Sequence, residues 1–369
     1  MKESIAVILV ESSFRQAHWW QVYEQNLAEE ISRRSLDITF VYDSAIPDAP
    51  TDEPRLAILF GSTAGWLYET LALCRRSMLK PVIVSPEPKE PVPGASLVLP
   101  DRVGSTHKLV AYLASHGKKK LAMFNPRPTS ANGQRREEAF LQACRDEACT
   151  GFVAGGPDPN AAAVSIASQA ASIDAVVCAD DLAAVFLLGE LAEAGIQVPD
   201  QLFVAGFGDS VLARHARPPL TTVTLDMKEL ARQAIGCALY LHRNPHTISL
   251  TCLVANQLVV RESTAFLPEG TAQQPGLLAL PSPDGYPAPE PDSPVLKMIS
   301  SLEACLSHAN DMDLAIMDAL RCGASCRKIA GQLYVSESTV YYRIDRLCQF
   351  AGVAGRERFL DQLRRYTRC

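Results

Sequence analysis

The chain has 369 residues, of which 47% are hydrophobic, so it is long enough for about two or three globular domains. Its formal net charge is −6, but the last 49 residues, from Arg321 onward, hold ten Lys and Arg against four Asp and Glu. No stretch reaches the roughly 18 uncharged apolar residues of a membrane helix, and the first apolar run, residues 5–10, is too short for a secretory signal. We therefore expect a soluble cytoplasmic protein whose basic tail meets a polyanion, unless that tail is only a solvated helical face.

Motifs of catalysis and of cofactor binding are missing from the sequence. The 11 cysteines show no paired CxxC spacing for a zinc or redox site, so we expect free thiols in a reducing compartment. There is no GxxxxGK[ST] phosphate loop, no GxSxG nucleophile elbow and no HExxH zinc helix. Gly206-Phe207-Gly208 lacks the third glycine of a dinucleotide loop. The sequence therefore predicts a binding protein rather than an enzyme, with neither metal nor cofactor.

Two series of alternating strands and helices follow one another along the chain, a pattern typical of parallel sheets covered on both faces. The first predicts strands at 5–10, 37–42, 56–60, 81–85 and 97–99, with helices at 20–33 and 65–80. The second predicts strands at 120–124, 151–154, 175–178 and 203–207, with helices at 134–146, 160–171 and 181–194. We expect an α/β protein with two lobes over residues 1–265.

The rest of the chain changes character. Residues 270–294 hold seven prolines and little periodicity, so we assign 266–294 as a Pro-rich, semi-rigid linker. Helical patterns then fill 294–307, 311–321, 325–333, 336–349 and 356–366. Residues 295–369 are therefore predicted to form a small all-α domain.

Six short segments carry a family resemblance, and they occur in that family's order. They are AYLASHGKKKLAMF at 111–124, RREEAF at 135–140, ADDLAA at 179–184, AGIQVPDQLFVAGFGDS at 194–210, PPLTTV at 218–223 and LVVREST at 258–264. Together they resemble the sensor domain of the LacI/GalR regulators, a type I periplasmic-binding-protein fold, over about residues 4–265. The resemblance implies two lobes joined by crossover strands, with a small molecule held between them.

The resemblance also implies residues that would line an effector cleft. Arg136 would bind a ligand hydroxyl or carboxylate, which suits the planar donor fork of a guanidinium. Asp101 and Asp181 would lie at strand-to-helix turns facing the cleft, and Phe14 would offer an apolar wall. Each has a simpler interpretation: the aspartates as helix N-terminal carboxylates, Arg136 as part of a solvated helix face, and Phe14 as a core or dimer contact.

One position departs from the family pattern. The LacI/GalR family usually has an acidic residue directly after the Gly-Phe of the segment at 194–210, and this chain has Gly208 there. The carboxylate that commonly binds a sugar hydroxyl is therefore missing, and Asp209 could replace it only if the loop is rearranged. We expect a small polar effector that is sugar-like or related.

A second motif lies in the basic tail, at residues 323–347. The segment GASCRKIAGQLYVSESTVYYRIDRL predicts two short amphipathic helices with a tight turn between them. Ser325 and Ser336 stand where N-caps belong. The spacing and the turn resemble the LuxR-type helix-turn-helix, in which the second helix buries one face and turns the other to the major groove of DNA. Here Val340, Ile344 and Leu347 would form the buried face.

The resemblance implies a set of DNA contacts on the opposite face. Ser338, Tyr341, Tyr342, Asp345 and Arg346 would face the groove, Lys328, Arg343 and Arg346 would lie near phosphates, and Ser336 and Thr339 at the helix start complete the set. The alternative is a helical bundle for protein contact, with Tyr341 and Tyr342 as interface aromatics. We favour DNA binding because the surrounding sequence is basic.

The two resemblances together predict a one-component transcriptional regulator, acting as a homodimer with DNA and a small-molecule effector as partners. LacI/GalR proteins carry the DNA reader before the sensor, whereas here it would follow the linker. Two alternatives remain: a solute-binding transport component, and a regulator with a vestigial cleft that responds to a partner protein, which Gly208 leaves open.

Overall fold

The computed structural model describes residues 4–12, 18–42, 56–61, 63–85, 87–88, 90–127, 131–156, 158–265 and 293–368. These residues form two compact units. The first unit contains the chain up to residue 104 together with residues 225–257, and the second contains 105–224, the residues from 258 onward and the C-terminal helices. The predicted linker lies outside the described residues up to 292, and so does Phe14.

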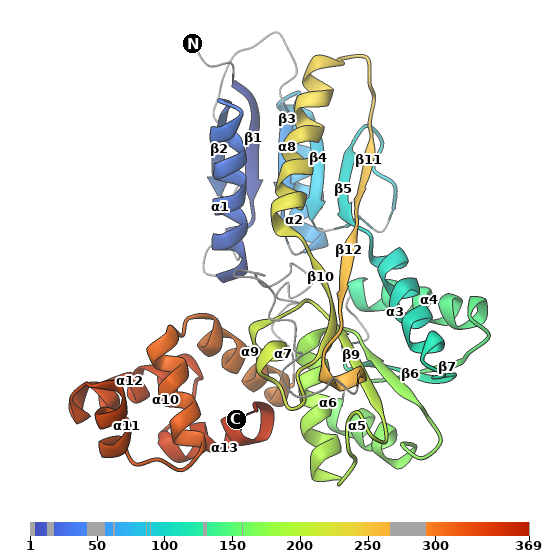
Figure 1. Cartoon of the computed structure of the whole chain (residues 1–369). Helices are drawn as coiled ribbons and strands as arrows, with labels where there is room; N and C mark the ends of the chain where they lie inside the picture. The colour runs from blue at the N-terminus through green and yellow to red at the C-terminus, as the bar shows by residue number, and fades with distance from the viewer. Residues whose placement is uncertain are drawn as a thin grey trace. The chain divides into compact units, whose positions relative to one another are not determined.

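The first unit is a parallel sheet between helices (Figure 1). Its strands are β1 (Ser4–Val10), β2 (Asp37–Tyr42), β3 (Leu56–Phe60), β4 (Lys80–Ser85), β5 (Ser96–Pro100) and β11 (Thr251–Val254), and its helices are α1 (His18–Arg33), α2 (Ala64–Arg76) and α8 (Met227–Arg243). The strand order is β11-β5-β4-β3-β1-β2, with parallel pairing throughout. One core lies between the sheet and α1 with α8, and another lies between the sheet and α2.

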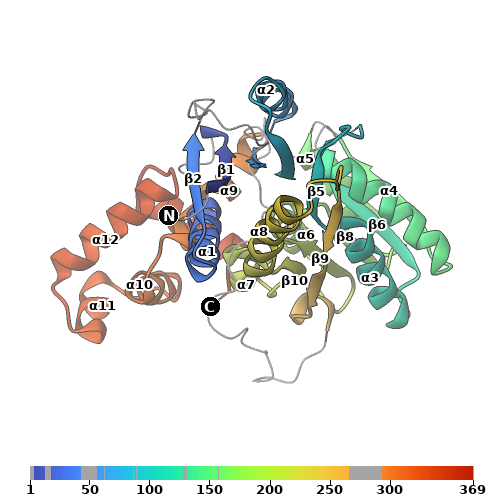
Figure 2. The ribbon, with the colours of Figure 1, turned by 90° about the horizontal axis from the view of Figure 1, so that it is seen from above.

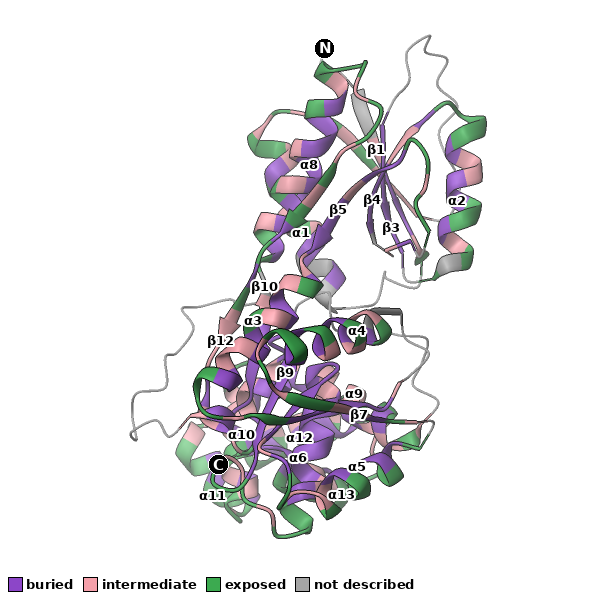
Figure 3. Cartoon of the chain, turned by 90° about the vertical axis from the view of Figure 1, so that its right-hand side faces the viewer, coloured by how far each residue is buried: buried purple, intermediate pink, exposed green. Residues whose placement is uncertain are grey.

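Strand β3 shows why these runs form buried strands. Ile58 and Phe60 enter the core under α1 and α8, while Ala57 and Leu59 enter the core under α2. Successive side chains of a strand point to opposite faces, so a strand covered on both sides must be apolar at every position. All five residues of β3 are buried, as Figure 3 shows for the central strands.

The second unit repeats this architecture and adds the C-terminal helices. Its strands are β6 (Lys120–Asn125), β7 (Thr150–Gly155), β8 (Ala175–Cys178), β9 (Phe203–Phe207), β10 (Thr221–Leu225) and β12 (Asn256–Val259), in the order β12-β10-β9-β8-β6-β7. Its helices are α3 (Arg102–Ser115), α4 (Ala131–Asp146), α5 (Pro159–Ser168), α6 (Asp181–Glu193), α7 (Val211–His215), and the short 3-10 helix η2 (Glu262–Thr264). Helices α3 and α4 share one core with the sheet, and α5 and α6 share the other.

Five further helices follow: α9 (Pro294–Ser307), α10 (Asp311–Arg321), α11 (Cys326–Leu333), α12 (Glu337–Phe350) and α13 (Arg356–Tyr366). Helices α10, α11 and α12 lie together (Figure 2). Helix α9 packs on α6 and α7, and α13 packs on α6. These helices therefore share one hydrophobic core with the α/β part of the second unit, which we call the lobe. Where α13 meets α6, a Cβ added at Gly189 would lie 2.7 Å from the ring of Tyr366. Arg365 forms ion pairs with Glu190 at 2.5 Å and Glu193 at 3.0 Å.

The predicted α/β fold with two lobes and a helical tail is confirmed. The strands predicted at 37–42, 56–60, 175–178 and 203–207 and the helices at 294–307, 311–321 and 356–366 match at both ends. The helix predicted to reach residue 80 ends at Arg76, because the backbone turns to a positive φ of 51° at Met78 before β4 begins. Helices α7 and α8 and strands β10, β11 and β12 were not predicted from the sequence.

Candidate functional site

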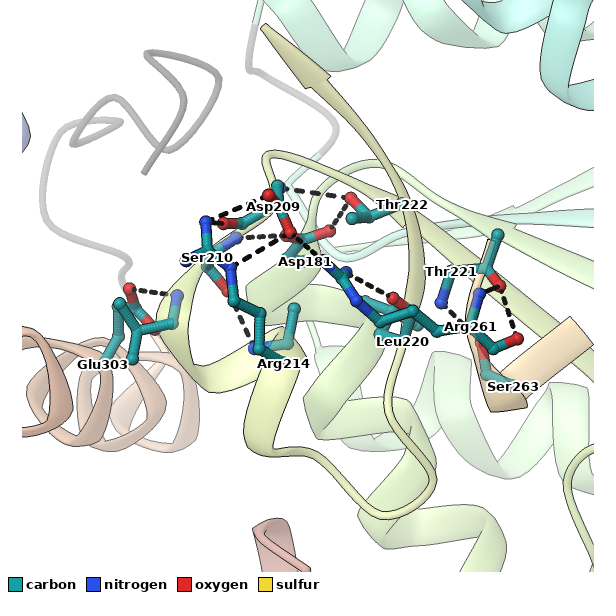
Figure 4. A network of polar contacts seen from close by, with 12 residues as sticks. Asp181, Asp209, Ser210, Arg214, Leu220, Thr221, Thr222, Arg261, Ser263 and Glu303 are labelled. Carbon is teal, nitrogen blue, oxygen red and sulfur yellow. Dashed lines mark hydrogen bonds and ion pairs between the residues drawn. The ribbon is translucent and has the colours of Figure 1, made fainter. Parts of the chain in front are cut away.

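A buried polar network lies at the carboxyl ends of β8 and β9 (Figure 4). Asp181 begins α6 shortly after β8, Asp209 follows β9, and their exposed fractions are 2% and 0%. Asp181 accepts hydrogen bonds from Thr222 Oγ1 at 2.6 Å and from the Ser210 N–H at 2.7 Å. The edge of a parallel sheet where the strands end is where open α/β folds bind ligands, so the network has the position of a binding site.

The two carboxylates differ in their partners. Asp209 pairs with Arg261 at 2.5 Å and with Arg214 at 3.0 Å, so two cations surround it. Asp181 is bonded mainly by neutral groups, and removal from water raises its pKa to about 7, although the bonds from Thr222 and Ser210 lower it. Asp181 can therefore change its charge near neutral pH when its surroundings change.

Two glycines leave room for Asp181. A Cβ at Gly206 would lie 2.6 Å from Asp181 Oδ1, so a side chain there would displace the carboxylate. Gly208 has a φ of +134°, a conformation that L side chains rarely adopt. Gly208 stands where the family usually has an acid, and Asp209 next to it points its carboxylate at two arginines. The local backbone thus accounts for the glycine.

Asp181 lies in the first turn of α6, as expected of a helix N-terminal carboxylate, but it does not cap the helix. Asp180 caps α6 instead, since its Oδ1 accepts the Ala183 N–H at 2.9 Å. Asp101, in the first unit, does act in the helix N-terminal way, because its Oδ1 accepts the Gly104 N–H at 2.8 Å. Asp101 lies directly after β5, as expected for a strand-to-helix turn, and is half-buried.

Arg136 is not part of a solvated helix face. Its exposed fraction is 2%, its Nη1 donates to the Ala179 carbonyl at 2.7 Å, and its guanidinium lies 4.4 Å from the centre of the Phe207 ring. Ala179 directly follows β8 and Phe207 ends β9, so Arg136 lies at the same sheet edge as the polar network.

Arg127 is a second arginine at this edge that the sequence did not reveal. It follows β6 and forms an ion pair with Asp180. Burial, and next the positive charge of Arg136, lower the pKa of Arg127 to about 10. Its place two residues after a strand was the available signal. Arg127 and Arg136 thus lie at the same sheet edge as Asp180, Asp181 and Asp209.

The two helices predicted at 325–333 and 336–349 are α11 and α12 of the second unit, and a tight turn joins them. Ser325 caps α11 by accepting the Lys328 N–H, and Ser336 caps α12 by accepting the Thr339 N–H at 3.1 Å. Tyr334, with a left-handed φ of 55°, ends α11 and starts the tight turn.

The predicted faces of α12 are confirmed by the burial of its side chains. Val340, Ile344 and Leu347 are buried. Tyr341 and Tyr342 are 52% and 68% exposed. Ser338 and Asp345 are exposed too, as is Lys328 on α11.

Arg346 differs from the expectation that it would be exposed. Asp313 of α10 has an exposed fraction of 0% and forms ion pairs with Arg346 at 2.6 Å and with Arg343 at 2.7 Å. The two arginines are half-buried, because a buried carboxylate draws both guanidinium groups against α10. Three charges in this cluster leave a net positive charge beside α12.

No helix in the described ranges is long and apolar enough to span a membrane. No group of three or more His, Cys, Asp and Glu side chains in that part of the chain is placed to hold a metal ion.

The comparisons with known proteins point to one group of regulators. A periplasmic-binding-protein-like domain family matches residues 110–264. An uncharacterised helix-turn-helix-type transcriptional regulator in the aml 5′ region of Streptomyces limosus is 34% identical over 185 residues, which are 46% of this chain and 51% of the relative. The ribose operon repressor of Haemophilus influenzae is 31% identical over 99 residues, 27% of this chain and 30% of the relative. The chain spans at most about half the length of these relatives.

Solved structures agree with the fold. A LacI transcriptional regulator from a Rhodococcus species is similar with a TM-score of 0.53 at 24% identity, covering 70% of this chain and 98% of that one. A complex of the transcriptional regulator CelR with cellobiose is similar with a TM-score of 0.56 at 19% identity, covering 71% and 85%. Residues 110–264 are therefore similar to a periplasmic-binding-protein-like domain, the α/β part has the fold of LacI-family structures, and the relatives named above are transcriptional regulators.

Proposed function

We propose that the protein is a DNA-binding transcriptional regulator whose α/β part binds a small polar metabolite and thereby controls the helix-turn-helix of α11 and α12. One observation carries the proposal: α12, with its exposed face, packs on α9 and α13, and these two helices pack on α6 of the lobe that holds the polar network. The homologues, which are named as transcriptional regulators, support it.

On the effector side, the sheet edge offers both signs of charge. Arg136 and Arg127 supply guanidinium donors, and Asp181 supplies a carboxyl group, a combination suited to hydroxyl-rich or anionic small molecules. A sugar-like effector is supported by relatives named for ribose and crystallised with cellobiose. Phe14 and Asp101 remain predicted effector contacts, and Asp209 would act by holding Arg214 and Arg261.

On the DNA side, we assign a LuxR-type helix-turn-helix in which α12 enters the major groove. Base edges would be met by Ser338, Tyr341, Tyr342 and Asp345, and phosphates by Lys328, Arg343, Arg346 and the helix start with Ser336 and Thr339. The protein would bind as a homodimer, so that two heads meet two half-sites.

The test has two stages. Sequences that the full chain selects from a random duplex library define an operator. A thermal-shift panel of sugars, polyols, nucleosides and organic acids then identifies an effector, because a ligand of the folded state raises Tm. The proposal expects an enriched motif whose affinity changes with the effector. No enriched motif in repeated selections, with DNA affinity unchanged by Tyr342→Ala, would contradict it.

A second candidate is a regulator whose α/β part responds to a partner protein. Gly208 in place of an acid and the full engagement of Asp209 with two arginines favour it, because both remove a carboxylate from effector binding. Selection of an operator together with a thermal-shift panel that gives no hit would favour this candidate.

A further inference from the structure

The C-terminal part of the chain binds helix α7 at both of its ends. At its start, the carboxylate of Glu303 on α9 accepts the N–H groups of Val211 at 3.0 Å and Leu212 at 2.6 Å. At its end, the N–H of Arg368 donates to the His215 carbonyl at 2.7 Å. A helix of five residues bound at both ends cannot shift without changing these bonds.

The same helix is bound to the buried polar network. The N–H of Ser210, its N-cap, donates to Asp181 Oδ2 at 2.7 Å, and Arg214 pairs with Asp209 at 3.0 Å. Three consecutive backbone N–H groups, at residues 210, 211 and 212, are thus divided between Asp181 and Glu303. Figure 4 shows the start of α7 between the network and Glu303.

The helix that carries Glu303, α9, contacts the predicted recognition helix α12. Two residues along α9, the Sγ of Cys305 donates to the carbonyl of Leu347 on α12 at 3.5 Å, and α9 packs against α12. Glu303 is half-buried, and removal from water raises its pKa, although the N–H donors of Leu212 and Val211 lower it. The charged form of this half-buried carboxylate is stabilised by its N–H donors, so moving these donors away costs free energy.

We propose that α7 is the relay between the effector site and the helix-turn-helix: a group that engages Asp181 changes its bond to Ser210, α7 shifts, and Glu303 passes the shift through α9 to α12. The relay rests on the proposed function, since it takes the polar network as the effector end and α12 as the DNA end. A ligand can shift an equilibrium only through contacts that differ between two states, and the shared N–H groups supply such contacts. The competing explanation is that Glu303 only fastens the helices to the lobe.

Hydrogen exchange of the full chain, followed by mass spectrometry, tests the relay. Asp181→Ala removes the acceptor of the Ser210 N–H. We expect exchange to rise several-fold at 210–215, in α9 and in the last turns of α12, around Leu347. A rise confined to 209–215 would overturn the relay. Asp181→Asn keeps the shape and an acceptor, so it should give a smaller change in the same segments and serves if the alanine variant does not fold.

Asp174→Ala is the matched control. Its carboxylate, like that of Glu303, accepts two backbone N–H groups, from Lys119 and Lys120, each at 2.8 Å, and these donors belong to the start of β6 and not to α7 or α9. We expect exchange to rise only around residues 119 and 120. A rise in α9 equal to that of Asp181→Ala would show general loosening of the lobe and would overturn the relay.

Glu303→Gln separates relay from attachment. It leaves one acceptor oxygen and removes the charge, so the helices stay docked while the link to α7 weakens. In this background Asp181→Ala should no longer change exchange in α12. If Glu303 only fastens the helices, Glu303→Gln raises exchange in α9–α13 by itself, and the effect of Asp181→Ala adds to it.

A DNA-binding measurement keeps the two proposals distinguishable. Fluorescence anisotropy with a labelled mixed-sequence duplex at low salt reports whether the wild-type chain binds DNA at all. Absence of binding would contradict the proposed function, while hydrogen exchange would still decide the relay. Binding by every variant together with unchanged exchange in α9 and α12 would overturn the relay and leave the proposed function standing.

Discussion

Two neighbouring carboxylates in the second unit have opposite electrostatic settings. Asp209 is balanced by Arg214 and Arg261, whereas Asp181 has a hydroxyl and a backbone N–H as its closest partners. Both are buried, so the difference lies in their partners and not in their depth. Asp209 holds the loop after β9 through its two ion pairs. Asp181 is the carboxyl group whose charge can change when its surroundings change.

Asp181 should make stability fall as pH rises. Burial raises its pKa from the ordinary 3.8 to about 7, so the folded chain holds a proton that the unfolded chain releases. This contribution is present below about pH 4 and is lost as pH rises through about 7. Between about pH 5 and pH 8 the wild type should lose on the order of 2 kcal/mol of unfolding free energy relative to Asp181→Asn. Denaturant titrations measure this, and parallel pH curves would contradict it.

Arg136→Ala should abolish the effector response and spare DNA binding. The substitution removes the donor to the Ala179 carbonyl and the contact with the Phe207 ring at the effector edge, far along the chain from α12. We expect affinity for the effector identified by thermal shift to fall at least about tenfold, roughly one charge-assisted hydrogen bond. Arg145→Ala, on the same helix and bonded to Gln142 at the surface, is the control. Unchanged affinity in Arg136→Ala would refute its proposed role.

At the scale of elements, α12 depends on α10 for the position of its cations. Asp313 should therefore matter to both stability and DNA affinity. Asp313→Asn leaves Arg343 and Arg346 facing each other without a carboxylate, and we expect a loss of about 1–3 kcal/mol of unfolding free energy with weaker DNA binding. Asp318→Asn on the same helix breaks a pair in which Asp318 is 67% exposed, so it should cost less than about 1 kcal/mol. Equal losses of unfolding free energy in the two variants would argue against a role for Asp313 in positioning Arg343 and Arg346.

Side chains on the outer face of α12 should affect DNA affinity and leave effector affinity unchanged. Tyr342→Ala removes an exposed ring from the predicted groove face and should weaken operator binding by about 1–3 kcal/mol, while effector affinity stays the same. Arg346→Ala should act in the same direction. Gln349→Ala, also exposed but a full turn beyond Asp345, serves as the control in the anisotropy titration. A Tyr342→Ala chain with wild-type affinity would favour the protein-contact interpretation of this helix.

The sequence predicted most elements with apolar periodicity, although it missed the amphipathic helix α8, and it missed strands whose buried residues are polar. Strand β10 carries Thr221 and Thr222, which are buried because their hydroxyl groups bond to Arg261, Thr264 and Asp181, not because they are apolar. The candidate site was predicted in part: Arg136 and Asp181 do lie at one sheet edge. Their partners stand far away along the chain, so only the register of the sheet brings them together.

At the scale of the whole molecule, Gly189 of the lobe leaves room for the ring of Tyr366 on the tail. Gly189→Ala should push α13 away from α6, because its Cβ would lie 2.7 Å from the ring. We expect a loss of about 1–3 kcal/mol in unfolding free energy and faster proteolysis of α13. Gly236→Ala on α8 has open space around its Cβ and should be neutral or stabilising by up to about 1 kcal/mol. Similar melting of the two variants would contradict the close packing.

Helix α6 has little surface that could face water. Residues 183–189 are buried without interruption, and a helix that is apolar all round needs neighbours on every side. The sheet and α5 cover part of it, and α9 and α13 cover more. A chain cut after residue 265 would expose the apolar surface of α6 that α9 and α13 cover, and it should aggregate. The C-terminal helices therefore cannot be replaced as an independent domain. A hybrid regulator that borrows this DNA reader would have to borrow α6 and α7 with it.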